Sequence, residues 1–172
     1  MSRSGVITFK GNPLTLAGEE LQVGQAAPDF TLHYYDDGLK TITPADLKGK
    51  PTILNVVPSL DTPVCATQTK KFNEELGTLG EQVNAVTVSL DLPFAQGRFC
   101  GAEGITNLRW GSAYQNRTFG QNYGVLIEEL KLLTRAVVVL DADGKVTYAE
   151  IVPEVTAEPN YGAALAALKR QL

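Results

Sequence analysis

The chain turns at PSLDTPVC, residues 58–65, which joins a continuous apolar run, Thr52 to Val57, to an amphipathic segment, residues 66–79. This order predicts a strand, then a turn, then a helix. Thr62 is a good helix N-cap, and Pro63 suits the first helical position because its φ is fixed and it has no N–H to leave unpaired. The last residue of the stretch, a cysteine, is therefore expected in the first turn of the helix.

Cys65 is this cysteine, and its predicted position changes the chemistry of its thiol. Unpaired backbone N–H groups and the positive end of the helix dipole favour the thiolate form. The alternative is a structural role, because free cysteine is often a small buried apolar residue. Cys65 follows a turn at the carboxyl end of a predicted parallel strand, where open α/β sheets place their sites. We therefore interpret Cys65 as a candidate nucleophile and keep the structural role as the alternative.

The rest of the chain has the pattern of an α/β protein. Residues 84–90 form a second predicted parallel strand, so residues 52–90 make one right-handed strand, helix, strand unit. A final helix at 159–172 should cover one face of the sheet with Leu165, Leu168 and Leu172. The other predicted elements are a β-hairpin at 5–16, strands at 29–35, 108–113, 136–140 and 146–151, a short helical turn after Thr43 and a helix at 116–123.

The second cysteine, Cys100, lies in the segment DLPFAQGRFCG, residues 91–101. Asp91 can cap a helix there, but Gly97 and Gly101 lower its stability. A marginal helix is well placed to move. A disulfide needs Cα atoms within about 7 Å, so two cysteines set further apart in the reduced fold would require a local rearrangement. We predict such a rearrangement around Cys100.

Composition narrows the class of protein. The 172 residues, 44% of them hydrophobic, suit one compact domain with a full core. The net charge of -4 arises from dispersed charges, which argues against nucleic-acid and membrane partners. The N-terminal residues lack the apolar core of a signal peptide, so we expect a cytoplasmic protein in which two cysteines are redox-active or inert. With two cysteines and one histidine, we expect no metal site.

Three single residues admit structural interpretations. His33 lies on the polar side of an alternating strand pattern, and Trp110 is interpreted as a packing residue. Arg135 directly precedes an apolar strand. It is either a solvated end with a salt-bridge partner or a charged donor aimed at a site near the edge of the sheet. Its position alone favours the first reading.

Taken together, these residues resemble the thiol peroxidase branch of the peroxiredoxins. The resemblance rests on Pro58, Thr62 and Cys65 in PSLDTPVC, and on the later motifs DLPFAQGRFCGAEG and RAVVVLD. It implies a thioredoxin-like α/β fold in which helices flank a central mixed sheet. The expected organisation is a single domain over residues 1–172, with an added N-terminal hairpin over residues 1–17.

The resemblance also implies a mechanism, that of an atypical 2-Cys peroxiredoxin. Cys65 would be the peroxidatic cysteine, which becomes a sulfenic acid on reaction with hydrogen peroxide or an organic hydroperoxide. Cys100 would resolve it as an intrachain disulfide that thioredoxin reduces. The Thr62 hydroxyl and a backbone N–H of the first helical turn would orient the peroxide, Arg135 would stabilise the developing charge, and Pro58 would shield the thiolate from solvent. The resemblance implies a homodimer and requires no metal, flavin or haem.

The same residues also bear on three other classes of protein. A general dithiol exchange protein would carry a Cys-x-x-Cys pair, but Thr62 stands three positions before Cys65. A cysteine hydrolase needs a histidine base, and the sole histidine, His33, has no matching motif. A redox sensor or binding module that uses the same disulfide as a switch, without turnover, stays open as the alternative.

Overall fold

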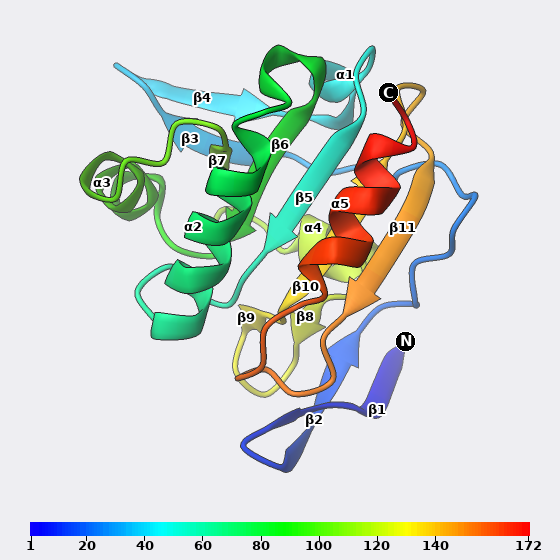
Figure 1. Cartoon of the computed structure of the whole chain (residues 1–172). Coiled ribbons are helices and arrows are strands. Elements are labelled where there is room, and N and C mark those ends of the chain that lie inside the picture. The colour runs from blue at the N-terminus through cyan, green and yellow to red at the C-terminus, as the bar shows by residue number, and fades with distance from the viewer.

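A seven-stranded mixed sheet forms the centre of the computed structural model, which describes residues 1–172 (Figure 1). Its strands are β3 (Leu32–Tyr35), β4 (Leu39–Ile42), β5 (Thr52–Val56), β6 (Asn84–Ser89), β7 (Arg109–Ser112), β10 (Ala136–Leu140) and β11 (Val146–Ile151). Their order is β11-β10-β5-β6-β7-β3-β4. β5 is parallel to β6 and antiparallel to β10, so β5 lies inside the sheet and is buried along its whole length.

Helices cover both faces of this sheet. They are α1 (Pro44–Leu47), α2 (Pro63–Leu76), α3 (Pro93–Ala102), α4 (Thr118–Asn122) and α5 (Tyr161–Lys169), with a short 3-10 helix at Gly80–Gln82. Figure 1 shows α2 and α5 in front of the sheet and α4 behind it. Alternate residues of β5 serve the two sides, because side chains alternate along a strand. Ile53 packs with Phe72 and Leu165 on the α2 side, whereas Leu54 packs in the other cluster with Phe119.

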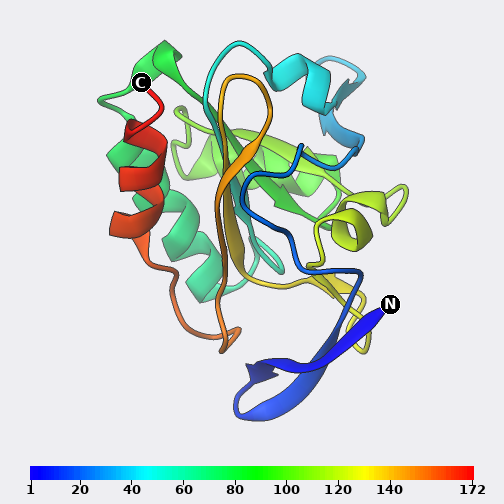
Figure 2. The same cartoon turned by 90° about the vertical axis from the view of Figure 1, so that its right-hand side faces the viewer.

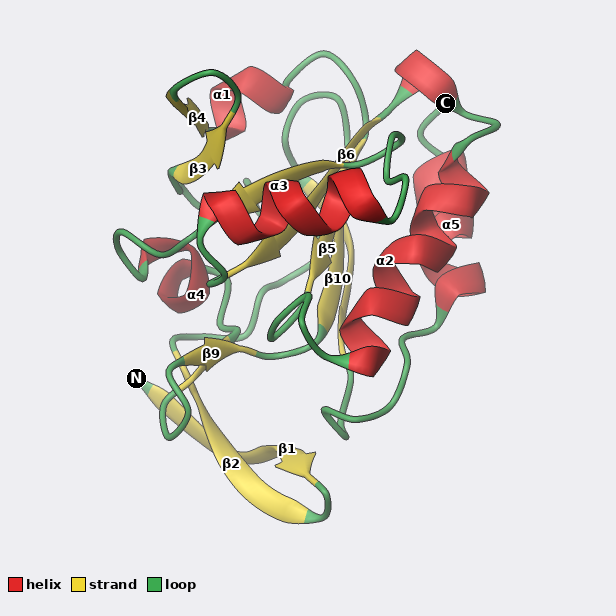
Figure 3. Ribbon diagram, turned by 90° about the vertical axis from the view of Figure 1, so that its left-hand side faces the viewer, coloured by secondary structure: helices red, strands yellow, loops and turns green.

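The unit β5, α2, β6 sets the position of the candidate nucleophile. Both strands run in the same direction, as their apolar runs predict, and α2 makes the crossover between them. The turn 57–62 therefore begins at the carboxyl end of β5 and delivers the chain to the start of α2. Figure 3 shows α2 beside α5, with α3 lying across the same side of the sheet.

A second, smaller sheet carries the N-terminus. The predicted hairpin is β1 (Ser2–Phe9) and β2 (Asn12–Ala17), joined by Lys10 and Gly11, both with positive φ. β2 pairs further with β8 (Leu126–Ile127), which pairs with β9 (Leu132–Leu133), in the order β1-β2-β8-β9. Figure 2 shows the hairpin projecting beyond one end of the large sheet.

Several boundaries differ from the sequence-based expectations. The last helix ends at Lys169, before the predicted 172, and Leu172 is 54% exposed because it lies past the helix end. Asp91 is not the N-cap of α3, since Leu92 takes that position. The strand expected at 29–35 is shorter, and so is the helix expected at 116–123. No helix is long and apolar enough to cross a membrane, and no cluster of three or more potential metal-ligating His, Cys, Asp or Glu side chains occurs.

Gly18 links the hairpin to the body of the protein and gives a test of this arrangement. Its φ is +81°, and a Cβ there would overlap the carbonyl oxygen of Gln121. Gly11 has a similar φ of +83° but faces open space. Gly11→Ala should therefore cost about 1 kcal/mol of unfolding free energy from backbone strain alone. Gly18→Ala should cost about 3 kcal/mol, because the clash adds to the strain.

Urea unfolding of the wild type and both variants measures the two losses of unfolding free energy. The dependence of this free energy on urea concentration should be the same for all three proteins. Equal losses for the two alanines would mean that Gly18 and the backbone at Gln121 do not approach as closely as described.

Candidate active site

The start of α2 is built as its sequence predicts, with one change. Thr62 is the N-cap residue in extended conformation, and Pro63 occupies the first helical turn. The Thr62 hydroxyl makes no capping bond, however, and instead donates to the carbonyl oxygen of Ser59 at 2.8 Å. The side chain thus tightens the turn before the helix. The first N–H groups of α2 have no partner within the helix, as at any helix N-terminus.

Cys65 is fully buried in this first turn, and its sulfur contacts a cation. Arg135 Nη2 lies 3.3 Å from Cys65 Sγ, and Arg135 is itself only 2% exposed. The pairing of β5 with β10 explains the approach. Val56, near the end of β5, lies opposite Ala136 at the start of β10, so the residue before β10 meets the turn after β5. The guanidinium thus donates a hydrogen bond directly to the sulfur.

A chain of buried hydrogen bonds holds Arg135 in place. Its Nε donates to the carbonyl oxygen of Val155 and its Nη1 to Gln68 Oε1, both at 2.8 Å. The Gln68 side-chain amide donates in turn to Asn55 Oδ1. Asn55 Nδ2 donates to two threonine hydroxyls, those of Thr69 and Thr87. The donors and acceptors of the two amides are thereby fixed, so that the Gln68 oxygen faces the guanidinium.

Sequence reasoning missed both Gln68 and Asn55. A signal existed for each of them. Asn55 is the polar residue inside the otherwise apolar run of β5, and Gln68 follows Cys65 by three positions, on the same side of the helix. Both are fully buried, and buried polar side chains are expected to be hydrogen-bonded.

A cavity of about 380 Å³ brings together three of the predicted site residues, Pro58, Thr62 and Arg135. Val64, which precedes the buried Cys65 in the chain, also lines it, and so does Arg135, whose guanidinium contacts the Cys65 sulfur. The opposite wall is largely apolar: Phe9 comes from the hairpin, Ile127, Leu130 and Leu132 from β8, β9 and the turn between them, and Val155 from the loop after β11. The predicted N-terminal hairpin thus forms part of the cavity wall.

Glu154 fastens the tip of this hairpin. Its carboxylate accepts hydrogen bonds from the Thr8 hydroxyl and the Gly11 N–H, each at 2.9 Å, and from the hydroxyl and N–H of Thr156. These bonds lower the pKa of Glu154, with those from Thr156 contributing most. Backbone bonds between Thr8 and residues 153 and 155 join the same two segments.

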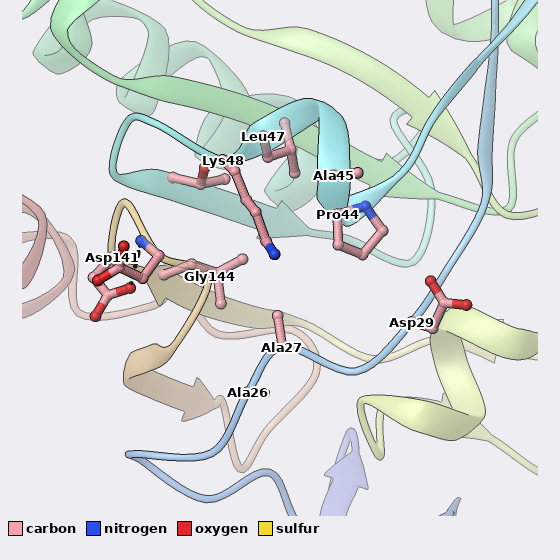
Figure 4. A pocket seen from close by; sticks show the side chains of 12 residues that line it. Ala26, Ala27, Asp29, Pro44, Ala45, Leu47, Lys48, Asp141 and Gly144 are labelled. Carbon is pink, nitrogen blue, oxygen red and sulfur yellow. Dashed lines mark hydrogen bonds between the residues drawn. The ribbon is translucent and has the colours of Figure 1, made fainter.

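A second hollow lies at the far end of the large sheet and contains none of the predicted site residues. It measures about 200 Å³ and is lined by α1, residues 26–29 and the turn after β10. Figure 4 shows the Lys48 amine pointing into it. Because Arg135 lies before β10 and Asp141 after it, the length of this strand separates the hollow from Cys65.

Cys100 lies apart from Cys65 in a different part of the core. Both are free thiols and both are buried. Cys65 packs with Val57 and Leu60, whereas Cys100 packs with the residues between α2 and α5. Burial raises the pKa of the Cys100 thiol from 9.0 to about 12. In the docked α3, Cys100 is therefore a neutral thiol at physiological pH.

The chain is similar to known proteins along most of its length. Residues 22–165 match the family model Redoxin. The thiol peroxidase of Bacillus subtilis (strain 168) is 52% identical over 163 residues, which cover 95% of this chain and 96% of that protein. The thiol peroxidase of Streptococcus sanguinis is 52% identical over 162 residues, covering 94% of this chain and 98% of that protein.

Solved structures are similar to this chain as well. A peroxiredoxin-like protein from Aquifex aeolicus superimposes with a TM-score of 0.89 at 42% identity, covering 99% of this chain and 98% of its own. The thiol peroxidase from Chromobacterium violaceum shares the fold, with a TM-score of 0.82 at 20% identity and 95% coverage of both chains. These matches confirm the predicted thioredoxin-like class with its N-terminal hairpin. The chain thus belongs to the Redoxin family and, within it, to the thiol peroxidases, thiol-dependent oxidoreductases of the peroxiredoxin type.

Proposed function

We propose that Cys65 is the peroxidatic cysteine and that Cys100 resolves it. The observation that carries the proposal is the 3.3 Å contact between Arg135 Nη2 and Cys65 Sγ at a helix start that borders a cavity. In the first step the Cys65 thiolate attacks the nearer oxygen of the hydroperoxide, and the O–O bond breaks. Cys65 becomes a sulfenic acid, and the other oxygen takes up a proton and leaves as water or an alcohol.

Three residues act on the peroxide in this step. Arg135 stabilises the negative charge that develops on the oxygens, and the Thr62 hydroxyl orients the substrate. Pro58 shields the sulfur from water. The presence of all three in the lining of one cavity supports these roles. The apolar side chains on the opposite wall, including Phe9 and Leu130, support organic hydroperoxides as substrates alongside hydrogen peroxide.

Resolution is the second step. The Cys100 sulfur attacks the Cys65 sulfur, water leaves, and an intrachain disulfide forms. Cys100 is docked as a neutral thiol in another part of the core, which supports the predicted local rearrangement of α3. The reduced dithiol of thioredoxin then reduces this disulfide. Both cysteines return to thiols, and thioredoxin is left with a disulfide. Repeated turnover of this kind separates the enzyme from a sensor that reacts once.

The wider setting follows from the same chemistry and from the family resemblance. A disulfide that must be reduced in every cycle fits a reducing compartment, the cytoplasm. The resemblance supports a homodimer of single-domain chains that spans residues 1–172 in each copy. Sedimentation equilibrium of the reduced chain measures the oligomeric state directly.

The two cysteines should separate in a single-turnover experiment. With one equivalent of hydrogen peroxide, the wild type should lose both thiols, and Cys100→Ser should stop at a Cys65 sulfenic acid, without recycling by thioredoxin. Cys65→Ser should consume no peroxide at an enzymatic rate. Free-thiol counts and intact mass follow each species. Full activity in Cys65→Ser would remove this residue from the site.

The rate of peroxide attack should depend on the Thr62 hydroxyl more than on the volume of the Thr62 side chain. Thr62→Val keeps the shape but removes the hydroxyl, so the rate constant for peroxide attack should fall by roughly 10²-fold. Thr62→Ser keeps the hydroxyl and should stay near the wild-type rate. Rapid-mixing kinetics with hydrogen peroxide provide the comparison. Equal rates for the valine and serine variants would contradict the orienting role.

Docking of α3 should depend on pH through Cys100. Because burial raises the pKa of Cys100 from 9.0 to about 12, its contribution to docking is complete below pH 9 and is lost as the pH rises towards 12. The fluorescence of Trp110, the sole tryptophan, should report the change because its indole faces Gly97 of α3. Cys100→Ser should remove this part of the titration. Identical titration curves for both proteins would show that the thiol does not control docking.

A further inference from the structure

One carboxylate ties the Cys65 turn to the end of β6. Asp91 Oδ1 accepts a hydrogen bond from the Ser59 hydroxyl at 2.7 Å. Its Oδ2 accepts from the Leu60 N–H at 2.8 Å and from the Ser89 hydroxyl at 2.7 Å. Ser59 and Leu60 belong to the turn that leads to Thr62 and Cys65. Asp91 directly precedes Leu92, the N-cap of α3, so it stands at the junction between turn and helix.

The same cluster extends along α3 towards the second cysteine. Ser89 Oγ also accepts a hydrogen bond from Gln96 Nε2 at 2.9 Å, and Gln96 donates further to the carbonyl oxygen of Gly111 at 3.1 Å. Gln96 is buried and lies one helical turn before Cys100, so the two share a face of α3. Hydrogen bonds therefore run from the Cys65 turn through Asp91 and Ser89 to Gln96 on the Cys100 helix.

Other polar contacts also hold α3: Lys70 of α2 pairs with Glu103 at the C-cap of α3, and the Ser112 hydroxyl donates to the Asp91 carbonyl oxygen. Two buried polar atoms at the helix are nevertheless unsatisfied. Gln96 Oε1 is buried without a hydrogen-bond partner, and so is Trp110 Nε1, which faces Gly97 of the helix. Unpaired buried polar atoms and helical glycines both weaken docking. A hollow of about 280 Å³ lies between the turn and the helix, lined by Ser59, Asp91 and Phe99 among others. The polar cluster at Asp91 is thus a main polar tie between the two segments.

We propose that Asp91 is a positioning residue that couples the Cys65 turn to the docking of α3. While α3 is docked, the carboxylate holds the turn in the geometry that reduces peroxide. When α3 leaves, the backbone at residue 91 moves with it, and the carboxylate releases Ser59 and Leu60. Both cysteine-bearing segments are freed together, so that Cys100 can attack the Cys65 sulfenic acid. This inference rests on the proposed roles of the two cysteines.

The test weakens the carboxylate and follows the two chemical steps separately. Asp91→Asn keeps the volume but turns one acceptor into a donor that faces other donors. Peroxide attack should become several-fold slower, and disulfide formation from the sulfenic acid several-fold faster. Excess peroxide should then leave less sulfinic acid, which forms when the sulfenic acid persists. Stopped-flow fluorescence of Trp110 and mass analysis of quenched samples measure all three quantities.

Asp61→Asn is the matched control, because it removes one negative charge from the same turn and its side chain makes no hydrogen bond or ion pair. It should behave as the wild type. Ser59→Ala removes the hydrogen bond to Asp91 and the one that Ser59 Oγ accepts from the Asp61 N–H. It should shift both rates in the same directions as Asp91→Asn, by less, because the Leu60 N–H still binds the carboxylate. This variant keeps the inference testable if Asp91→Asn folds poorly.

The outcomes distinguish the two proposals. Asp91→Asn and Ser59→Ala are each compared with Asp61→Asn in the rate of disulfide formation and the yield of sulfinic acid. If neither variant differs from this control, the coupling role of Asp91 is wrong and the proposed function still stands. A wild-type chain that forms no disulfide between Cys65 and Cys100 would overturn the proposed function and the coupling with it.

Discussion

The contact between Arg135 and the Cys65 sulfur governs the design of this site. A guanidinium that is 2% exposed has given up its water, so its charge and its donors must be satisfied by the protein. The carbonyl oxygen of Val155 and the Gln68 amide satisfy two of the donors, and the sulfur receives a third. The same hydrogen bonds that satisfy the buried cation therefore hold it against the Cys65 sulfur.

This requirement explains the polar residues in the centre of the sheet. Asn55 interrupts an apolar strand at the cost of burying an amide, and that amide is hydrogen-bonded on both sides. Replacing it by an apolar residue would leave the Gln68 amide without an acceptor, and the Gln68 oxygen would then be free to turn from the guanidinium. The interior hydrogen bonds of this protein thus fix one orientation of the charged group.

Much of the fold could be predicted from the sequence, because its central strands are long apolar runs bounded by turn residues. The strands 136–140 and 146–151 match β10 and β11 at both ends. β8 and β9 were not predicted, since strands of two residues carry no periodicity and depend on pairing with the distant β2. The helix start at Thr62 was predictable for local reasons. The position of Arg135 beside Cys65 was not, because it depends on which strands pair, and only the family resemblance indicated it.

The loop at residues 153–156 has two neighbours that serve different purposes. Val155 holds Arg135 through its carbonyl oxygen, while Glu154 fastens the hairpin tip that brings Phe9 to the cavity. The charged group and the hairpin wall of the cavity are therefore held by neighbouring residues of one loop. A different side chain at residue 9 would change the shape of the cavity and leave every hydrogen bond of Arg135 in place. The shape of the cavity is thus separable from the contacts that orient the guanidinium.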